Sequence, residues 1–168
     1  MDYDVLRIRQ ATLKQQYRNA PETALVTLHA NGAVAGDITC QVSTHCGPVT
    51  AGLHPATGGD GSEACSGDML LQALVACTGV TLTAVAKAMG VTITRGEITA
   101  DGDLDFRGTL GVSRESRVGF EKIRLHISLD CNATEAQRDK LLELTERYCV
   151  VYQTLRSGIP IHTSCTYV

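Results

Sequence analysis

The feature that constrains this chain most is an uncharged stretch, residues 69–86, near the middle of the sequence. A run of this length predicts a helix that is apolar on nearly every side, and it also meets the length requirement for crossing a membrane. Polar positions within it, Gln72 among them, weaken the membrane interpretation. We therefore expect a buried central helix and no membrane span. Ser66 would cap this helix, Asp68 would lie in its first turn and Gly90 would end it.

A helix that is apolar all round needs neighbours on nearly every face. A single domain of 168 residues covers such a helix with difficulty. We therefore expect a second copy of the chain to complete the cover, which predicts a homodimer.

Composition narrows the possible functions. Hydrophobic residues make up 43% and charged residues 20% of the chain, as in ordinary soluble domains. A net charge of −3 argues against binding to nucleic acid or to an anionic membrane. The first residues are acidic and no apolar segment follows them, so there is no sign of a secretion signal. These features predict a cytoplasmic protein.

Periodicity predicts an α+β fold. Apolar residues at helical spacing predict an N-terminal helical arm over residues 1–21, ended by Pro21, before one domain over residues 22–168. A second long helix is expected from Thr134, with Gln137 completing a capping box, to about Leu155. Alternation and turn residues predict strands at residues 25–30, 37–43, 48–53, 91–100, 102–110, 120–129 and 159–168. Strands and helices in this order are typical of α+β proteins.

Seven cysteines are many for a cytosolic protein, and the odd number argues against a complete disulfide framework. Cys77 and Cys149 each fall inside an expected helix, on a face shared with apolar and threonine residues. If the two helices cross there, the pair forms a thiol–disulfide redox centre. The plainer alternative is two inert cysteines in the core, because free cysteine is commonly buried.

A reactive Cys77 needs a group that stabilises its thiolate, because burial alone disfavours the charged form. Cys77 lies too deep in its own helix for the helix dipole to help. An arginine is the natural stabilising group, and Arg147, Arg156 and Arg18 are the candidates. Cys65 is the second candidate for a reactive thiol, since it directly precedes the central helix and its free amide groups.

A metal site is a weaker possibility. Two histidines and three cysteines could be assembled into a zinc or redox-sensing site: His45, His54, Cys40, Cys46 and Cys65. They contain no Cys-x-x-Cys pair, so we expect neither a metal nor a bound cofactor. The glycine-rich residues 58–61 lack the lysine and hydroxyl of a phosphate-binding loop, and they predict a surface loop.

The segments around the two helical cysteines resemble the OsmC/Ohr family, the osmotically inducible and organic-hydroperoxide-resistance proteins. The first is residues 66–78, SGDMLLQALVACT, which ends one residue after Cys77. The second is residues 149–155, CVVYQTL, followed by IPI at 159–161. The order of elements agrees with the family from about residue 25 to the end of the chain.

This resemblance implies an OsmC-like fold: antiparallel sheets around a long central helix, in an intertwined homodimer. It also implies an antioxidant, stress-response role as a cysteine-based peroxidase. Cys77 would attack an organic hydroperoxide and become a sulfenic acid, and Cys149 would resolve it to a disulfide. An external dithiol of the lipoyl type would then reduce the disulfide.

The chain also departs from the family pattern. Family members use an arginine from an early strand or loop and a glutamate at the start of the central helix, but residues 25–61 contain no arginine or lysine. Gly67 and Asp68 stand where the glutamate would fall, and Val150 replaces a proline that follows the second cysteine. Arg18 and Asp68 are the candidate replacements. These departures favour an alternative, a non-catalytic OsmC-like dimer that binds a small apolar ligand at its interface, lined by Gly79 and the threonines of the central helix.

Overall fold

The computed structural model describes residues 3–34 and 37–167. The chain forms two compact units, residues 1–50 and 51–168, which are described separately. This division does not coincide with the expected boundary at residue 21, and a single domain over 22–168 stays a prediction. The first two residues of the expected arm and Val168, the last residue of the expected final strand, lie outside the described residues.

The first unit contains the expected N-terminal helix, α1 (Tyr3–Asn19), and a short 3-10 helix, η1 (Pro21–Ala24). The expected strand at 25–30 is wrong. These residues form no strand, and Leu25 is 88% exposed, so its apolar side chain has nothing to pack against within the chain. The strands begin later, with β1 (Gly32–Ala33) antiparallel to β2 (Cys40–Thr44), followed by β3 (Gly47–Gly52).

The second unit begins within β3, whose last residues pair in parallel with β4 (Ala64–Cys65). Next comes the central helix, α2 (Ser66–Ala88), as expected. The residue at its N-cap is Cys65 rather than Ser66, and no side chain caps the helix there. Its end is a Schellman motif: Gly90 is left-handed (φ +69°), and Val91 N–H donates to Ala86 O at 2.9 Å. Glycine is favoured there because it adopts this conformation without strain.

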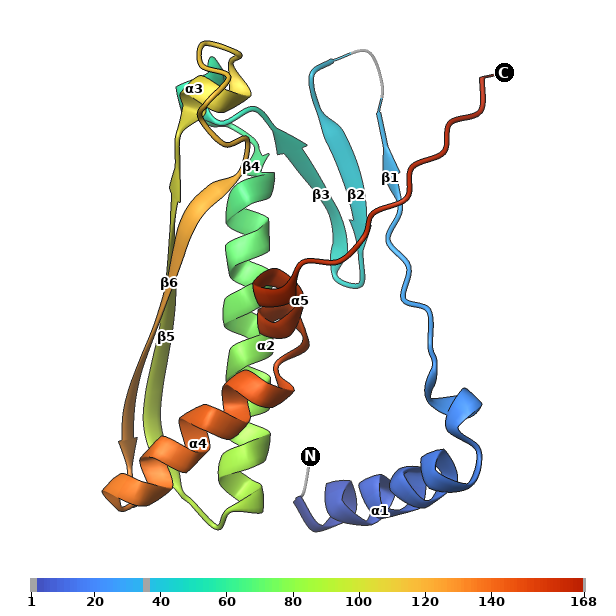
Figure 1. Ribbon diagram of the computed structural model, residues 1–168, viewed down its shortest axis with the longest axis vertical. Helices are drawn as coiled ribbons and strands as arrows, with labels where there is room; N and C mark the ends of the chain where they lie inside the picture. The colour runs from blue at the N-terminus through green and yellow to red at the C-terminus, as the bar shows by residue number, and fades with distance from the viewer. Residues whose placement is uncertain (1–2, 35–36, 168) are drawn as a thin grey trace. The chain divides into compact units, whose positions relative to one another are not determined.

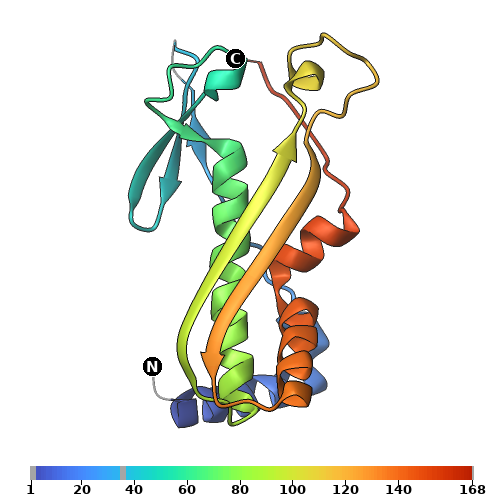
Figure 2. The ribbon, with the colours of Figure 1, turned by 90° about the vertical axis from the view of Figure 1, so that its left-hand side faces the viewer.

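Two groups of elements pack on α2. The ribbon of β5 (Ile93–Leu104) and β6 (Phe120–Cys131) runs along one side of it (Figure 2). The helices α4 (Glu135–Tyr148) and α5 (Val150–Ser157) pack on another side (Figure 1). Together they bury a single stripe of α2, spaced every fourth residue: Leu74, Thr78, Leu82 and Ala86.

Within the single chain α2 is not buried on nearly every side, in agreement with the expectation that one domain covers this helix with difficulty. Val80 is 74% exposed, and only 22% of the most apolar window of α2 is buried. By length and composition α2 is the one helix among the described residues that could cross a membrane. A second subunit covering the rest of α2 stays a prediction.

The β5–β6 ribbon corrects another expectation. The two strands expected at 91–100 and 102–110 are one strand, β5, followed by the short helix α3 (Phe106–Thr109). Asp101 and Gly102 continue the antiparallel ladder with Arg124 and Ile123 instead of turning. A Cβ on Gly102 would lie 2.3 Å from the Phe120 ring, so this glycine is explained by the close approach of that ring.

The strand expected at 120–129 is confirmed as β6, in which half-buried Ile123, Leu125, Ile127 and Leu129 alternate with exposed residues. The capping box of α4 is also confirmed: Gln137 N–H donates to Thr134 Oγ1 at 3.3 Å, and Thr134 N–H donates to Gln137 Oε1 at 2.9 Å.

The C-terminal part differs from expectation in two places. The second helix is broken at Cys149 into α4 and α5, so Cys149 is not inside a helix. The strand expected at 159–168 is absent from the described residues, and Ile161 is 86% exposed there. Nothing within the chain covers this segment's apolar side chains.

Candidate active site

The second unit brings Cys77 and Cys149 together. Cys77, on α2, is half-buried, and Cys149, between α4 and α5, is 1% exposed. The Cys149 thiol is one of the neighbouring groups that lower the pKa of Cys77, and neither cysteine is in a disulfide. The two helical segments therefore meet at their cysteines, which is the geometric condition for a redox pair.

The break at Cys149 shapes this site. Cys149 is extended (φ −73°, ψ 109°), ends α4 and precedes the first residue of α5. Its N–H still donates to Thr145 O at 2.9 Å, while its carbonyl accepts from Gln153 N–H at 3.0 Å. The Gln153 side chain donates to Glu146 O at 2.8 Å, which satisfies a carbonyl that the break leaves free. The break is thus a well-bonded corner between two helices.

This corner points the N-terminus of α5 at Cys77. Burial raises the pKa of the Cys77 thiol, but hydrogen bonds from the backbone N–H groups of Val151 and Val150, the Cys149 thiol and the Thr81 hydroxyl outweigh it and lower the pKa below its ordinary value. The first amide groups of a helix have no intrahelical acceptor and carry the positive end of its dipole, so they favour a thiolate.

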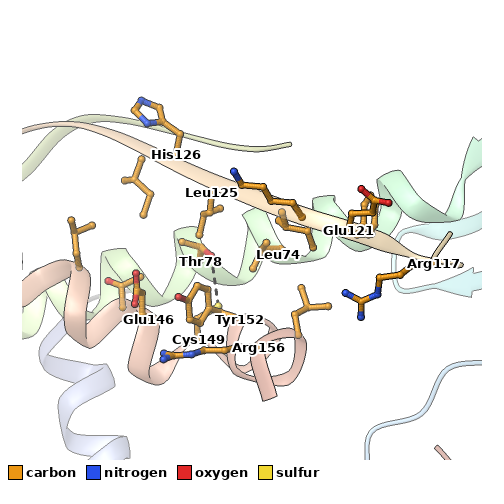
Figure 3. Close-up of a pocket in the computed structure, with 17 residues that line it drawn as sticks. Leu74, Thr78, Arg117, Glu121, Leu125, His126, Glu146, Cys149, Tyr152 and Arg156 are labelled. Atoms are coloured by element: carbon orange, nitrogen blue, oxygen red, sulfur yellow. Dashed lines mark hydrogen bonds between the residues drawn. The ribbon is translucent and has the colours of Figure 1, made fainter. Parts of the chain in front are cut away.

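Cys149 has a different partner. Thr78, also on α2 and 1% exposed, lies with its Oγ1 3.7 Å from Cys149 Sγ (Figure 3). When the single thiol proton of Cys149 points to Cys77, the Thr78 hydroxyl is left as the donor to Cys149 Sγ. The hydrogen bonds then run in one direction, from Thr78 through Cys149 to the Cys77 sulfur.

A pocket of about 680 Å³ lies on the Cys149 side of this arrangement (Figure 3). It is lined by α2, β6, α4, α5 and the loop before β6. Cys149, Thr78 and Tyr152 line it, whereas Cys77 is not one of the described residues that do. The ligand site expected at the subunit interface, lined by Gly79 and the threonines of α2, stays a prediction.

Charged groups surround Tyr152 in this pocket. Burial raises the pKa of Tyr152, and the Glu146 carboxylate, which accepts a hydrogen bond from the phenol, raises it further. Arg156 opposes this effect. Tyr152, Arg156 and Cys149 all line this pocket (Figure 3).

The second unit gives no support to the expectation that an arginine activates Cys77. No lysine or arginine in the described part of the chain is among the groups that lower the Cys77 pKa. Arg147 lies over the Tyr148 ring, 5.4 Å from its centroid, and Arg156 lines the pocket. Arg18 belongs to the first unit, and its assignment to the site stays a prediction.

Asp68 is not brought to the thiols. It lies nine residues before Cys77 on α2, roughly 13 Å along the helix axis at about 1.5 Å per residue. It lines a second pocket of about 360 Å³ with Cys65 and His54. His54 stacks on Phe106 there (centroids 4.9 Å apart), and its Nδ1 accepts from Ala56 N–H at 3.0 Å.

The described residues hold no cluster of three or more histidine, cysteine, aspartate or glutamate side chains able to bind a metal ion. The zinc-site hypothesis therefore gains no support.

The amide groups of Val150 and Val151 were missed because the sequence YCVVYQ contains neither glycine nor proline to signal a new helix start.

A family model described as OsmC-like protein matches residues 59–164, well over half of the chain. The chain belongs to the OsmC-like protein family. The match includes both Cys77 and Cys149, so the resemblance around these cysteines is confirmed at the level of the family.

Solved structures share this fold. An OsmC-like protein from Mycoplasma pneumoniae is 18% identical with a TM-score of 0.65, covering 79% of this chain and 89% of its own. An organic hydroperoxide resistance protein OsmC from Legionella pneumophila is 18% identical (TM-score 0.62; 80% and 92% covered). One from Elizabethkingia anophelis is 17% identical (TM-score 0.62; 80% and 91% covered). No curated protein matches the sequence. At these identities the similarity establishes the α+β, OsmC-like fold.

Proposed function

We propose that the protein is a cysteine-based peroxidase that reduces organic hydroperoxides, with Cys77 as the nucleophile and Cys149 as the resolving thiol. The observation that carries this proposal is the hydrogen bonding of Cys77. Four neighbouring groups lower the pKa of its thiol, and one of them is the thiol that would resolve its oxidised form.

The chemistry follows from these positions. The Cys77 thiolate attacks one oxygen of the hydroperoxide and breaks the O–O bond. The alcohol leaves with a proton, and Cys77 becomes a sulfenic acid. Cys149 Sγ then attacks the Cys77 sulfur, releases water and forms the disulfide, which an external dithiol reduces.

The names of similar proteins support the proposed peroxidase function. Family members among the similar structures carry names of organic hydroperoxide resistance proteins. We also propose that the active form is a cytoplasmic homodimer, because much of the apolar surface of α2 is uncovered in one chain. The reductant would be a lipoyl-type dithiol.

Thiol counting after one equivalent of cumene hydroperoxide tests the proposal. We expect two of the seven thiols to be lost, and peptide mass spectrometry to link Cys77 to Cys149. An unchanged thiol count would contradict it. Binding of an apolar ligand by the same unreacted protein would then favour the non-catalytic alternative, for which the pocket beside Thr78 provides space.

A further inference from the structure

We propose that the reducing dithiol enters the 680 Å³ pocket and attacks Cys149 Sγ, so that the disulfide is reduced at the sulfur that lines the pocket. This inference rests on the proposed function, in that it takes Cys77 and Cys149 as the redox pair. It adds the site of the reductant, the sulfur that is attacked and the shape of molecule that fits.

Access distinguishes the two sulfurs. Among the described residues that line the pocket, Cys149 is present and Cys77 is not, so a molecule entering the pocket meets Cys149 first. Cys149 is 1% exposed whereas Cys77 is half-buried, so a thiol would have to reach Cys149 through the pocket and not across the open surface. A thiol at the end of a slender aliphatic chain can reach it.

The leaving group favours the same direction. Attack on Cys149 Sγ expels Cys77 as a thiolate, and the amide groups of Val150 and Val151 and the Thr81 hydroxyl already donate to that sulfur. A thiol whose pKa is lowered leaves faster in thiol–disulfide exchange. Attack on Cys77 would expel Cys149 instead, toward the single hydroxyl of Thr78.

The walls of the pocket suit an aliphatic chain. Leu74, Leu125, Ile127 and Leu155 contribute apolar surface. Its charged residues have both signs, Arg117, Lys122 and Arg156 with Glu121 and Glu146, so they select no strongly charged molecule. A volume of about 680 Å³ is in the range of small-molecule sites.

The reduction balances in two steps. The first thiolate of the dithiol attacks Cys149 Sγ, a new S–S bond joins the reductant to Cys149, and Cys77 leaves as a thiolate. The second thiol loses its proton, and its sulfur attacks the first sulfur of the reductant. The reductant becomes a cyclic disulfide, and Cys149 leaves and takes up a proton. Two electrons pass from the dithiol to the protein.

Trapping the first step tests which sulfur is attacked. The protein is oxidised with diamide, which forms the disulfide without peroxide, then mixed with 2-mercaptoethanol and quenched with N-ethylmaleimide. We expect peptide mass spectrometry to find mercaptoethanol on Cys149 and maleimide on Cys77. The reverse pattern, or no disulfide between these two residues, would overturn the proposal.

Narrowing the pocket tests the route. Leu142 lines the pocket and is 40% exposed, so Leu142→Trp adds bulk there with little strain, while Val112→Trp, in a loop outside the pocket, is the matched control. We expect Leu142→Trp to slow reduction by dithiothreitol several-fold more than it slows oxidation by cumene hydroperoxide. Equal effects on both half-reactions, or equal rates in both variants, would overturn it.

These experiments separate this inference from the proposed function. Diamide replaces the peroxide, so the adduct pattern is read even if cumene hydroperoxide leaves Cys77 unreacted. Conversely, rapid oxidation by peroxide together with an adduct on Cys77 would support the peroxidase function and contradict the proposed reductant site.

Discussion

Cys77 and Cys149 share one hydrogen bond, but their surroundings are opposite in kind. Cys77 is half-buried, and backbone amides and a hydroxyl lower the pKa of its thiol. Cys149 is 1% exposed and has the Thr78 hydroxyl and a pocket beside it. The groups that favour charge are thus concentrated on one sulfur of the pair. On this difference we base the proposal that Cys77 attacks the peroxide and Cys149 resolves the oxidised sulfur.

The comparison also shows how backbone can do the work of a side chain. The family pattern supplies an arginine from a segment that here has none, and a proline where this chain has Val150. Proline has no N–H, whereas Val150 donates one to Cys77. The backbone N–H that a proline would lack is therefore available at the Cys77 sulfur.

The largest expected effect comes from replacing each of the two cysteines in turn with serine. Cys77→Ser should reduce peroxide consumption to the background rate. Cys149→Ser should still consume one equivalent of cumene hydroperoxide and then stop, with a sulfenic acid on Cys77 that dimedone traps. Dimedone labelling followed by peptide mass spectrometry checks this, and a fully active Cys77→Ser variant would remove the distinction between the thiols.

Thr78→Val should have a smaller effect, confined to the Cys149 side. It removes the hydroxyl 3.7 Å from Cys149 Sγ and nearly keeps the side-chain shape. We expect slower disulfide formation after peroxide attack and a loss of about 1 kcal/mol in the free energy of unfolding. Stopped-flow kinetics and urea denaturation measure the two effects. Thr78→Ser keeps the hydroxyl and should restore the rate; if it does not, the hydroxyl is not the cause.

The pH dependence of stability should show the lowered pKa of Cys77. The pKa of Cys77 is lower in the folded protein than in the unfolded chain, so the unfolded chain binds more protons between the two values. The free energy of unfolding should therefore rise with pH through that window, and this gain should be lost as pH falls through the folded pKa. Urea denaturation at several pH values, compared with Cys77→Ser, measures it. Identical profiles would show that folding does not stabilise the thiolate.

The smallest expected effect is that of Asp68→Asn. Asp68 lines the second pocket and lies roughly 13 Å from Cys77 along α2. We expect the rate at which iodoacetamide alkylates Cys77 to stay within twofold of the unchanged protein. A tenfold change in this rate would show that Asp68 influences the reactivity of Cys77.

Periodic patterns predicted much of the fold. The uncharged run predicted α2, Gly90 predicted its end, and alternation predicted β6. Expectations failed where local sequence lacked the deciding contact. Residues 25–30 have strand-like composition but no cover, and the break expected at residue 101 is absent because β5 continues through Gly102, which accommodates the Phe120 ring.

The residues alone left open whether the two cysteines meet or are two inert core cysteines, and the resemblance to the family implied that they form a pair. The sequence could not predict how Cys77 is activated. That depends on a break between Tyr148 and Val150, which has no glycine or proline and is held by the Gln153 side chain on Glu146 O. Such a corner is fixed by tertiary packing, which a propensity pattern does not contain.

The measurement that tests the central claim most directly is the pH dependence of Cys77 alkylation by iodoacetamide in two variants of residue 150. Val150→Pro removes one amide donor at a first helical position, where proline is compatible with the helix, while Val150→Ala keeps it. If the N-terminus of α5 activates Cys77, the proline variant should react about tenfold more slowly below the pKa, and the alanine variant should not. Equal rates in the two variants would contradict the account.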